Sequence, residues 1–414
     1  MIKEQIKELV REKLSSKKVI LFGAGKVAEE FYNEYKDKLH ITHCVSNYEK
    51  EWGEATFLGR LDVRKFCREE FREDEYIVVC GPIAFRTIEL QLINEGFRMY
   101  EHFVESNIAN AVCTGKRIAL FYGQCILRDI YRCIIQVSAF DKEYVSVYTQ
   151  TAKGQAVVTN RLLYHLKDIC DLYVYTPKLL DHDSAYSLSV EELPPDCKVV
   201  SVSNLVVSLY WPQVETKIDV YNKLYLHSYN AERSLDFYHT LYRREDININ
   251  RMVLEGKPTK EIVGTLSSDG FYSEEEVKRN YKMALKLVDI AERAVNVKIA
   301  DFIRENYQRE MLYQNAFHPN KCIIWEYVRR LLREIEISDE DVEKLEEGSP
   351  LHIHQSGDVP IYPSVAKCLH LHFVNKDTRY EILTGNKVVY MTFQEYTEHY
   401  IEYTRKVMEI MKMW

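Results

Sequence analysis

The chain has 414 residues, 46% of them hydrophobic and 29% charged, and its formal net charge is −8. This length suits two or three domains, and the mixing of Lys and Arg with acids along the whole chain excludes a basic stripe and argues against a nucleic-acid partner. No apolar run approaches a membrane span and the first residues lack a signal peptide's apolar core, so a soluble cytoplasmic protein without a transmembrane segment is expected.

Ten cysteines are scattered along the chain, and no two of them form a CxxC pair. The sequence therefore contains neither a zinc ribbon nor a thioredoxin-like motif. In a cytoplasmic protein, most of these cysteines are expected to be small buried hydrophobic side chains.

The N-terminal part has the pattern of a small α/β domain. Helices are expected at residues 1–16 and through about 35, and strands at 18–22, 41–46, 76–80 and 103–105. Gly23 and Gly25 stand between the first strand and the next helix, in the GxGxxA form of the dinucleotide fingerprint. The acid that would bind the ribose of NAD is missing, because Ser46 and Asn47 end the second strand.

Residues 1–112 are therefore interpreted as a Rossmann-like domain. They resemble the nucleotide-sugar-binding or sugar-binding Rossmann-like modules fused to bacterial polysaccharide enzymes. Gly23 and Gly25 are the candidate binding residues, and three alternatives are left open: NAD(P), another nucleotide or sugar, or no ligand.

A second α/β domain is expected to follow a join at residues 106–116, with Thr114 and Gly115 as its hinge. Strands are expected at residues 118–122, 144–149, 172–176 and 198–202, with a helix at 159–170 before the third of them. This alternation predicts a mainly parallel sheet. The domain is assigned to residues 115–414, with an α/β core at 115–235 and a helical part at 236–414.

The helical part carries clear start signals. Ser273 and Glu276 form a capping box that opens a long helix, with one apolar stripe continuing to Ile299. His318 and Pro319 are expected to open another helix through about residue 336, with His318 as its cap. A second capping box, Thr392 to Glu395, starts the final helix.

The chain from residue 115 onward is organised around the turn Gly123-Gln124-Cys125, between a buried strand and a helix. Such a turn lies at the carboxyl edge of a parallel sheet, where open α/β sheets hold ligands. It also places Cys125 at a helix start, where the helix dipole favours a thiolate or an oxyanion.

Residues 115–414 resemble the WcbI family of capsular polysaccharide biosynthesis proteins in three features. These are the Gly123–Cys125 turn, the helix with residues 292–303 leading to the His-Pro motif within 311–320, and residues 359–366 before the final helix. The sequence departs from the family pattern at Gln124, where Asn is expected, and at Ile126, where Gln is expected.

The resemblance implies an α/β, SGNH-like fold and an O-acetyltransferase of bacterial capsular or surface polysaccharide biosynthesis. Acetyl-CoA would be the donor, and a sugar or glycan the acceptor. Sequence alone leaves the oligomeric state open, a homo-oligomer included.

The candidate catalytic residues are Cys125, His318, Gln124 and Asn204. His318 is the candidate base, acting on the sugar hydroxyl or on Cys125, and a packing or capping histidine is the alternative. Cys125 is a nucleophile, an oxyanion neighbour or a small turn residue. Gln124 and the backbone after Gly123 are candidate oxyanion donors.

Two further residues have a binding role and a structural alternative. Asn204 follows the strand ending at Val202 and is either a donor at the sheet edge or a turn-forming residue. Gly123 and Arg128 are the candidate CoA-binding residues, and an ordinary ion pair is the favoured alternative for Arg128.

Four histidines form two His-x-His pairs, at His352 and His354 and at His370 and His372, which could chelate from one face of a strand. Only Cys368 is near enough in sequence to add a ligand, so no metal site is expected. Three other functions are kept as alternatives: an SGNH-like carbohydrate esterase, a non-catalytic nucleotide-sugar-binding accessory protein, and, more remotely, an NAD-dependent oxidoreductase.

Overall fold

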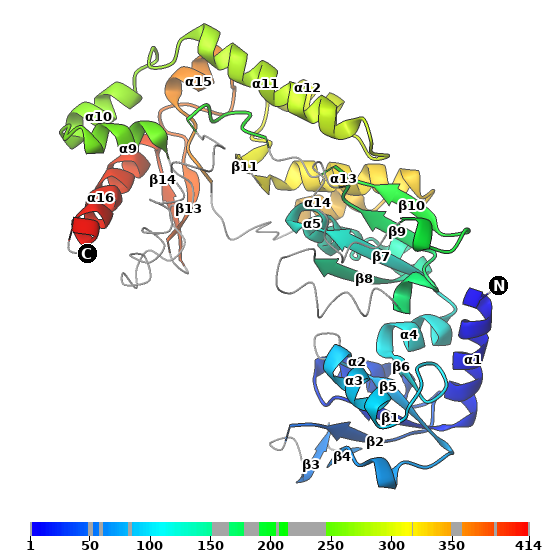
Figure 1. Cartoon of the computed structure of the whole chain (residues 1–414). Coiled ribbons are helices and arrows are strands. Elements are labelled where there is room, and N and C mark those ends of the chain that lie inside the picture. The colour runs from blue at the N-terminus through cyan, green and yellow to red at the C-terminus, as the bar shows by residue number, and fades with distance from the viewer. Residues whose placement is uncertain are drawn as a thin grey trace. The chain divides into compact units, whose positions relative to one another are not determined.

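The structure of the protein is a computed structural model. It describes residues 2–48, 53–57, 61–81, 85–150, 165–177, 190–203, 207–213, 246–316, 318–348, 358–384 and 387–412. The chain divides into two compact units, residues 1–202 with 331–342 and residues 203–330 with 343–414, and each unit is described by itself (Figure 1).

The first unit begins with a six-stranded sheet in the order β3-β4-β2-β1-β5-β6. Its strands are β1 Lys18–Phe22, β2 Ile41–Ser46, β3 Gly53–Phe57, β4 Leu61–Lys65, β5 Glu75–Val79 and β6 Phe103–Glu105. All neighbours run parallel except β3, which pairs antiparallel with β4 at the edge. Four of the five side chains of both β1 and β5 are buried, as expected for strands covered on both faces.

The helices of this sheet are α1 Ile2–Ser16, α2 Lys26–Tyr35 and α3 Phe85–Asn94, with a short 3₁₀ turn at Arg68–Glu70. The expected Rossmann-like order is confirmed, because β1 lies between β2 and β5. The strands β3 and β4 were not expected from the sequence.

The expected join at residues 106–116 is instead the helix α4, Ser106–Thr114. The Glu105 carboxylate caps its start by accepting hydrogen bonds from the N–H groups of Asn107 and Ile108, and Gly115 ends it in the left-handed conformation, with φ +71°. α4 contacts strands of both sheets of the unit (Figure 1), and one hydrophobic core runs through both sheets. Buried side chains of α4 belong to that core, so the residues predicted as the join form a packed helix, which ends at Gly115 of the predicted hinge.

The second sheet of the first unit is fully parallel, in the order β10-β9-β7-β8. Its strands are β7 Arg117–Gly123, β8 Tyr144–Gln150, β9 Leu172–Tyr175 and β10 Lys198–Ser201, and its helices include α5 Cys125–Ile134 and α6 Ser138–Glu143, with a 3₁₀ turn at Val190–Glu192. The mainly parallel α/β fold predicted from the sequence is confirmed. In the expected helix at 159–170, residues 165–167 are helical, and 159–164 lie outside the described residues.

The helix α1 is tied to this second sheet by charge. The Asp171 carboxylate lies 2.7 Å from the Lys3 ammonium and 3.2 Å from that of Lys7, and it accepts the Ile118 N–H at 2.8 Å. Burial acts to lower the pKa of Lys3, but its hydrogen bonds to Asp171 and Asp196 outweigh burial and raise it. The first helix of the chain is therefore part of the structure around β7 and β9.

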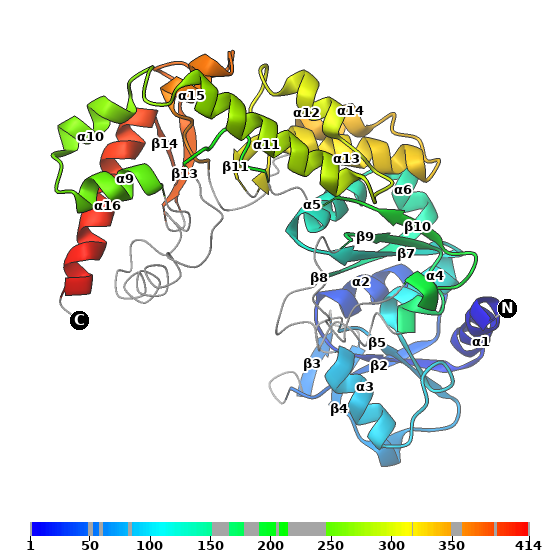
Figure 2. The same cartoon turned by 45° about the horizontal axis from the view of Figure 1, so that its top comes forward.

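The second unit is mostly helical. Its elements are α9 Ile247–Leu254, α10 Thr259–Leu266, α11 Glu274–Glu292, α12 Ala300–Asn306, β11 Tyr313–Asn315, β12 His318–Pro319, α13 Lys321–Glu334, α14 Val342–Gly348, α15 Pro363–Cys368, β13 Tyr380–Thr384, β14 Lys387–Met391 and α16 Phe393–Lys412. The last four residues of α13 and the first of α14 are assigned to the first unit. The strands pair as two antiparallel hairpins, β11–β12 and β13–β14, and α16 lies beside α9 and α10 (Figure 2).

Both capping boxes predicted from the sequence are present, at Ser273 and at Thr392. The helix after Ser273 is shorter than expected. It ends at Glu292, whose carboxylate accepts the N–H groups of Ile299 at 2.6 Å and Ala300 at 3.1 Å and so caps α12. The apolar stripe thus continues into a second helix.

The start of α9 is held by a fully buried carboxylate. Asp246 accepts the N–H groups of Asn248 and Ile249, each at 3.0 Å, and the Tyr362 hydroxyl at 2.8 Å, while its own N–H donates to the Tyr400 hydroxyl. Burial raises the pKa of Asp246 to about 6, although these hydrogen bonds act to lower it. The cap therefore joins three segments that are distant in sequence.

Candidate functional site

The turn Gly123-Gln124-Cys125 connects β7 directly to α5, as the sequence predicted. Gln124 precedes the helix with φ −90° and ψ −165°, and its side chain makes no capping hydrogen bond. The hydroxyl of Tyr148, on the neighbouring strand β8, donates to the carbonyl oxygens of Gly123 at 3.1 Å and Gln124 at 3.3 Å. The backbone of the turn is therefore fixed by a side chain that the sequence analysis did not select.

Gly123 lies where the sheet reverses its order, since β8 follows on one side of β7 and β9 on the other. Open α/β sheets hold ligands at this position. A Cβ atom on Gly123 would lie 2.7 Å from the Thr176 Oγ1 and 2.8 Å from the Leu127 Cδ2, both closer than real contacts allow. Only glycine lets α5 and the residue after β9 approach the strand so closely.

Cys125 is half-buried at the first position of α5, where the positive end of the helix dipole lies. Two other cysteines are held as thiols: burial raises the pKa of Cys44 to about 12 and that of Cys113 to about 11. Of the ten cysteines, Cys125 is the one that begins a helix at the carboxyl end of a parallel strand.

Two charged residues follow on the first turns of α5. The Arg128 Nε lies 3.6 Å from the Asp129 Oδ1, and the Asp129 side chain is almost fully buried while that of Arg128 is 29% exposed. This distance agrees with the ion pair that the sequence analysis favoured for Arg128. Arg128 lies within one turn of Cys125 along α5.

The buried hydroxyl of Thr149 is a further polar group at this edge. Thr149 pairs with Tyr122 across β8 and β7, and its hydroxyl makes no hydrogen bond to any described residue. Buried polar atoms are normally satisfied, so this one fits a position that a bound molecule or water completes. The sequence analysis ended a strand at Thr149, but the pairing with Tyr122 that places its hydroxyl here comes from the fold.

His318 belongs to the second unit and does not cap a helix. It lies in β12, paired with Asn315 of β11, and its N–H donates to the Asn315 Oδ1 at 3.0 Å. The helix α13 begins only at Lys321, whose N–H bonds the Asn320 side chain. The capping prediction was wrong because the hairpin extends the chain through Pro319.

Asn204 lies outside the described residues, so its predicted role remains a prediction. The residue before it, Ser203, has a buried hydroxyl 2.7 Å from the Tyr327 hydroxyl. Cys125 and His318 are in different units, and each is described within its own unit.

The N-terminal sheet has its own glycine at the equivalent place. Gly23 follows β1 with φ +119°, and a Cβ there would lie 3.0 Å from the Cys80 carbonyl oxygen, just after β5. Gly25 precedes α2 and has no atom within 4 Å of the corresponding position. At the end of β2, the Asn47 side chain donates to that of Gln91. Gly23 and Gly25 thus lie between β1 and α2, as the sequence predicted. The three alternatives for the ligand of this domain stay open.

Comparisons with known proteins address the second part of the chain. Residues 151–340 match the family model described as "Polysaccharide biosynthesis enzyme WcbI". The resemblance to WcbI is confirmed. The matched residues include His318 and Asn204 but not the Gly123–Cys125 turn, so the match is narrower than the expected 115–414.

A solved structure of WcbI shares the fold. The similarity covers 70% of this chain and 90% of that chain, with a TM-score of 0.52 and 15% sequence identity. That structure is of the native protein, without a disulfide bond between coenzyme A and one of its cysteines. A comparison with curated proteins gave no match.

The two His-x-His pairs lie after the residues that match the family model. His352 and His354 lie outside the described residues. His370 follows α15 with φ +53°, and the His372 N–H donates to the Gln308 carbonyl at 2.8 Å. Within the described ranges, no group of three His, Cys, Asp or Glu side chains is placed to hold a metal ion.

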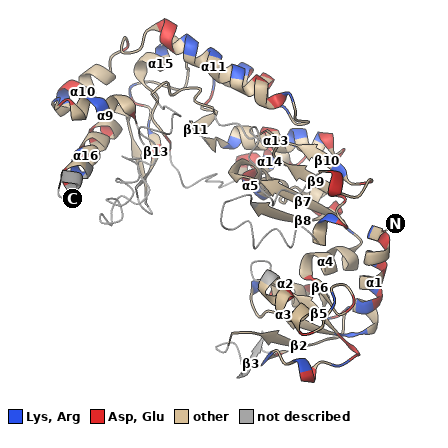
Figure 3. Ribbon diagram, in the orientation of Figure 1, with Lys and Arg blue, Asp and Glu red and all other residues tan. Residues whose placement is uncertain are grey.

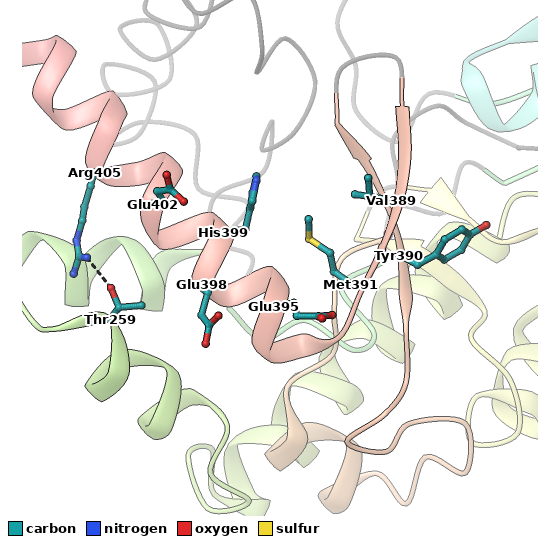
Figure 4. A pocket seen from close by; sticks show the side chains of 9 residues that line it. All are labelled: Thr259, Val389, Tyr390, Met391, Glu395, Glu398, His399, Glu402 and Arg405. Carbon is teal, nitrogen blue, oxygen red and sulfur yellow. Dashed lines mark hydrogen bonds between the residues drawn. The ribbon is translucent and has the colours of Figure 1, made fainter.

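A separate hollow of about 670 Å³ lies between β14 and α16 in the second unit (Figure 4). It is lined by Thr259, Val389, Tyr390, Met391, Glu395, Glu398, His399, Glu402 and Arg405. Arg405 turns toward Thr259, 2.7 Å away, and burial lowers the pKa of His399. Each of the three carboxylates contacts a neighbouring residue of α16 or its cap, so the hollow does not indicate a particular ligand.

No helix among the described residues has the length and apolar character needed to cross a membrane.

Proposed function

We propose that this chain is a polysaccharide biosynthesis enzyme that transfers an acetyl group from acetyl-CoA to a sugar hydroxyl. The observation that carries the proposal is the position of Cys125, at the start of α5 and at the carboxyl edge of a parallel sheet. The WcbI structure that shares the fold is of the native protein without a disulfide bond between coenzyme A and one of its cysteines. Cys125 is the cysteine of this chain best placed for that relation.

The surroundings of Cys125 suit a thioester and its phosphates. The start of α5 favours negative charge, the side chain of Arg128 is partly exposed one turn away, and Gly123 keeps the turn close to Thr176. Acetyl-CoA would supply the activated acyl group. Gln124 and the N–H groups of the first turn of α5 would stabilise the oxyanion.

In the proposed reaction, the sugar oxygen forms a bond to the thioester carbonyl carbon and the C–S bond breaks. His318 would accept the proton of the sugar hydroxyl, and the CoA sulfur would leave as the thiolate. The hydrogen bond from the His318 N–H to Asn315 holds the backbone at this residue. Cys125 would accept the acyl group first if transfer occurs in two steps, and Asn204 would donate to the oxyanion.

The N-terminal sheet would hold the acceptor or its nucleotide. This part of the proposal is supported by the approach of Gly23 to Cys80, at the point where the sheet order reverses. A nucleotide-linked sugar fits this role better than NAD(P), because Ser46 and Asn47 stand where a ribose-binding acid is needed. We propose that the enzyme acts in the cytoplasm, in the biosynthesis of the polysaccharide.

The first experiment is calorimetric titration of acetyl-CoA and CoA into the wild-type protein and into the Cys125→Ala and Cys113→Ala variants. Cys113 is a half-buried thiol away from the turn, so it is the matched control. We expect Cys113→Ala to bind acetyl-CoA and CoA with the affinity of the wild type. We expect Cys125→Ala to bind them with a different affinity. A well-folded wild type that binds neither ligand would overturn the proposal.

The second experiment measures the chemistry with labelled acetyl-CoA and sugar acceptors. We expect His318→Ala to lose transfer while keeping CoA binding, because a base acts after the donor is bound. Hydrolysis of p-nitrophenyl acetate that is unaffected by CoA, with no transfer to any sugar, would instead identify an esterase.

A further inference from the structure

Tyr148 lies beside the turn that ends at Cys125, although it is distant from that turn in sequence. It belongs to β8, and its strand partner in β7 is Phe121. The Tyr148 hydroxyl donates to two successive carbonyl oxygens of the turn, that of Gly123 at 3.1 Å and that of Gln124 at 3.3 Å. A hydroxyl has one hydrogen, so the two bonds share one donor. A single side chain therefore holds two neighbouring peptide units of the turn.

The ring of Tyr148 is held in place by α5. It stacks on the ring of Tyr131, with the ring centroids 5.6 Å apart and the planes at 28°. Tyr131 is itself fixed, because its hydroxyl donates to the Ser146 carbonyl of β8 at 3.2 Å and its ring packs against that of Phe121. Burial raises the pKa of Tyr148, so its hydroxyl keeps the proton that it donates. The donor thus has one position and one protonation state.

The two hydrogen bonds set the direction of the backbone at the start of α5. In a trans peptide the C=O and N–H groups point in opposite directions, so a Gly123 carbonyl held toward Tyr148 directs the N–H of the next residue away from it. The Gln124 carbonyl is held in the same way, and it also accepts the Arg128 N–H at 3.1 Å, the first hydrogen bond of α5. The hydroxyl therefore fixes how the first turn of α5 directs its N–H groups, which the proposed reaction uses to stabilise the oxyanion.

The Tyr148 hydroxyl also affects the charge at Cys125. A carbonyl oxygen carries partial negative charge, and the Gln124 carbonyl belongs to the peptide that leads into Cys125. A hydrogen bond to that oxygen withdraws part of its charge, which favours negative charge on the neighbouring thiol. Charged side chains of α5 act on Tyr148 as well, namely those of Arg128, Asp129 and Arg132 (Figure 3). Removal of the hydroxyl alone leaves these charges in place, so its effect can be measured separately.

We propose that Tyr148 is a positioning residue of the acyl-transfer site. It holds the peptides on both sides of Gln124 so that the first turn of α5 stabilises a thiolate at Cys125 and the oxyanion of the reaction. Its part in acetyl transfer rests on the proposed function, but its effect on the Cys125 thiol does not. The two proposals can therefore fail independently, and each has its own measurement.

The first test is the pH dependence of Cys125 alkylation by iodoacetamide in the full chain, followed by peptide mass spectrometry. Tyr148→Phe removes the hydroxyl and keeps the ring, and we expect it to raise the pKa of the Cys125 thiol by about one unit, the size of one lost hydrogen bond. Tyr131→Phe is the matched control, because its hydroxyl belongs to the same aromatic pair but donates to β8 instead of the turn. The control should keep the wild-type pKa. An equal pKa in Tyr148→Phe and the wild type would overturn the proposal.

The second test is steady-state acetyl transfer at varied acetyl-CoA concentration. We expect Tyr148→Phe to lower kcat by about tenfold and to leave KM unchanged, because the oxyanion forms only after the donor is bound. A lower melting temperature with the wild-type kcat would show a purely structural role and overturn the proposal. If the wild type transfers no acetyl group, the proposed function fails, and the alkylation test alone then decides the role of Tyr148.

Discussion

Replacing Gly123 by Ala is the sharpest perturbation of the candidate site. The new Cβ would lie 2.7 Å from the Thr176 Oγ1, 2.8 Å from the Leu127 Cδ2 and 3.1 Å from the Leu127 Cβ. The Thr176 hydroxyl can rotate, but Leu127 is 1% exposed and must move with its helix. Such overpacking costs about 1–3 kcal/mol of unfolding free energy, or roughly 2–10 °C in melting temperature for a unit of this size.

The assay is thermal and urea unfolding followed by acetyl-CoA titration. Gly264→Ala is the control, because this exposed glycine of α10 has nothing within 4 Å and a helical alanine should stabilise by about 1 kcal/mol. In a Leu127→Ala background, Gly123→Ala should cost less than in the wild type, since the two side chains compete for one space. Wild-type stability and CoA binding in Gly123→Ala would refute the close approach of α5.

Three further predictions concern titration and charge. Iodoacetamide should alkylate Cys125 before Cys113, whose pKa burial raises to about 11, as peptide mass spectrometry will show, and faster reaction of Cys113 would contradict this. Burial raises the pKa of Asp246 from 3.8 to about 6, so its stabilising contribution is full below about pH 4 and is lost as the pH rises through about 6. In Asp246→Asn, the unfolding free energy measured with urea should therefore change less between about pH 4 and pH 6 than in the wild type. An equal pH dependence in the two proteins would contradict the raised pKa of Asp246. Lys3→Met should lower the unfolding free energy by about 1–2 kcal/mol, because Lys7 still pairs with Asp171, and no loss in urea unfolding would mean that the Lys3 pair contributes nothing.

Local signals made much of the fold predictable. The parallel strands appear as short apolar runs, and Ser273 with Glu276 marks a helix start whatever surrounds it. The helix α4 was missed because its cap is the buried Glu105, a residue type that gives no start signal in a sequence. Likewise, the strand at His318 forms because it pairs with Asn315. The sequence analysis missed it because a His-Pro pair is also typical of a helix start.

The candidate site was predictable only where it is local. The Gly123–Cys125 turn lies within one strand–helix unit, so periodicity and a glycine were enough to find it. Tyr148 and Thr149 were missed because their role depends on β8 lying beside β7, which no spacing along the chain specifies.

The ion pairs of Lys3 and Lys7 with Asp171 set a condition on synthesis. The helix α1 is synthesised before its acidic partner Asp171, which follows more than 160 residues later. Domains generally fold in the order of their synthesis. The helix α1 therefore cannot complete these contacts until Asp171 has been synthesised, and a chain stopped at residue 112 would lack the ion pairs that join α1 to the second sheet.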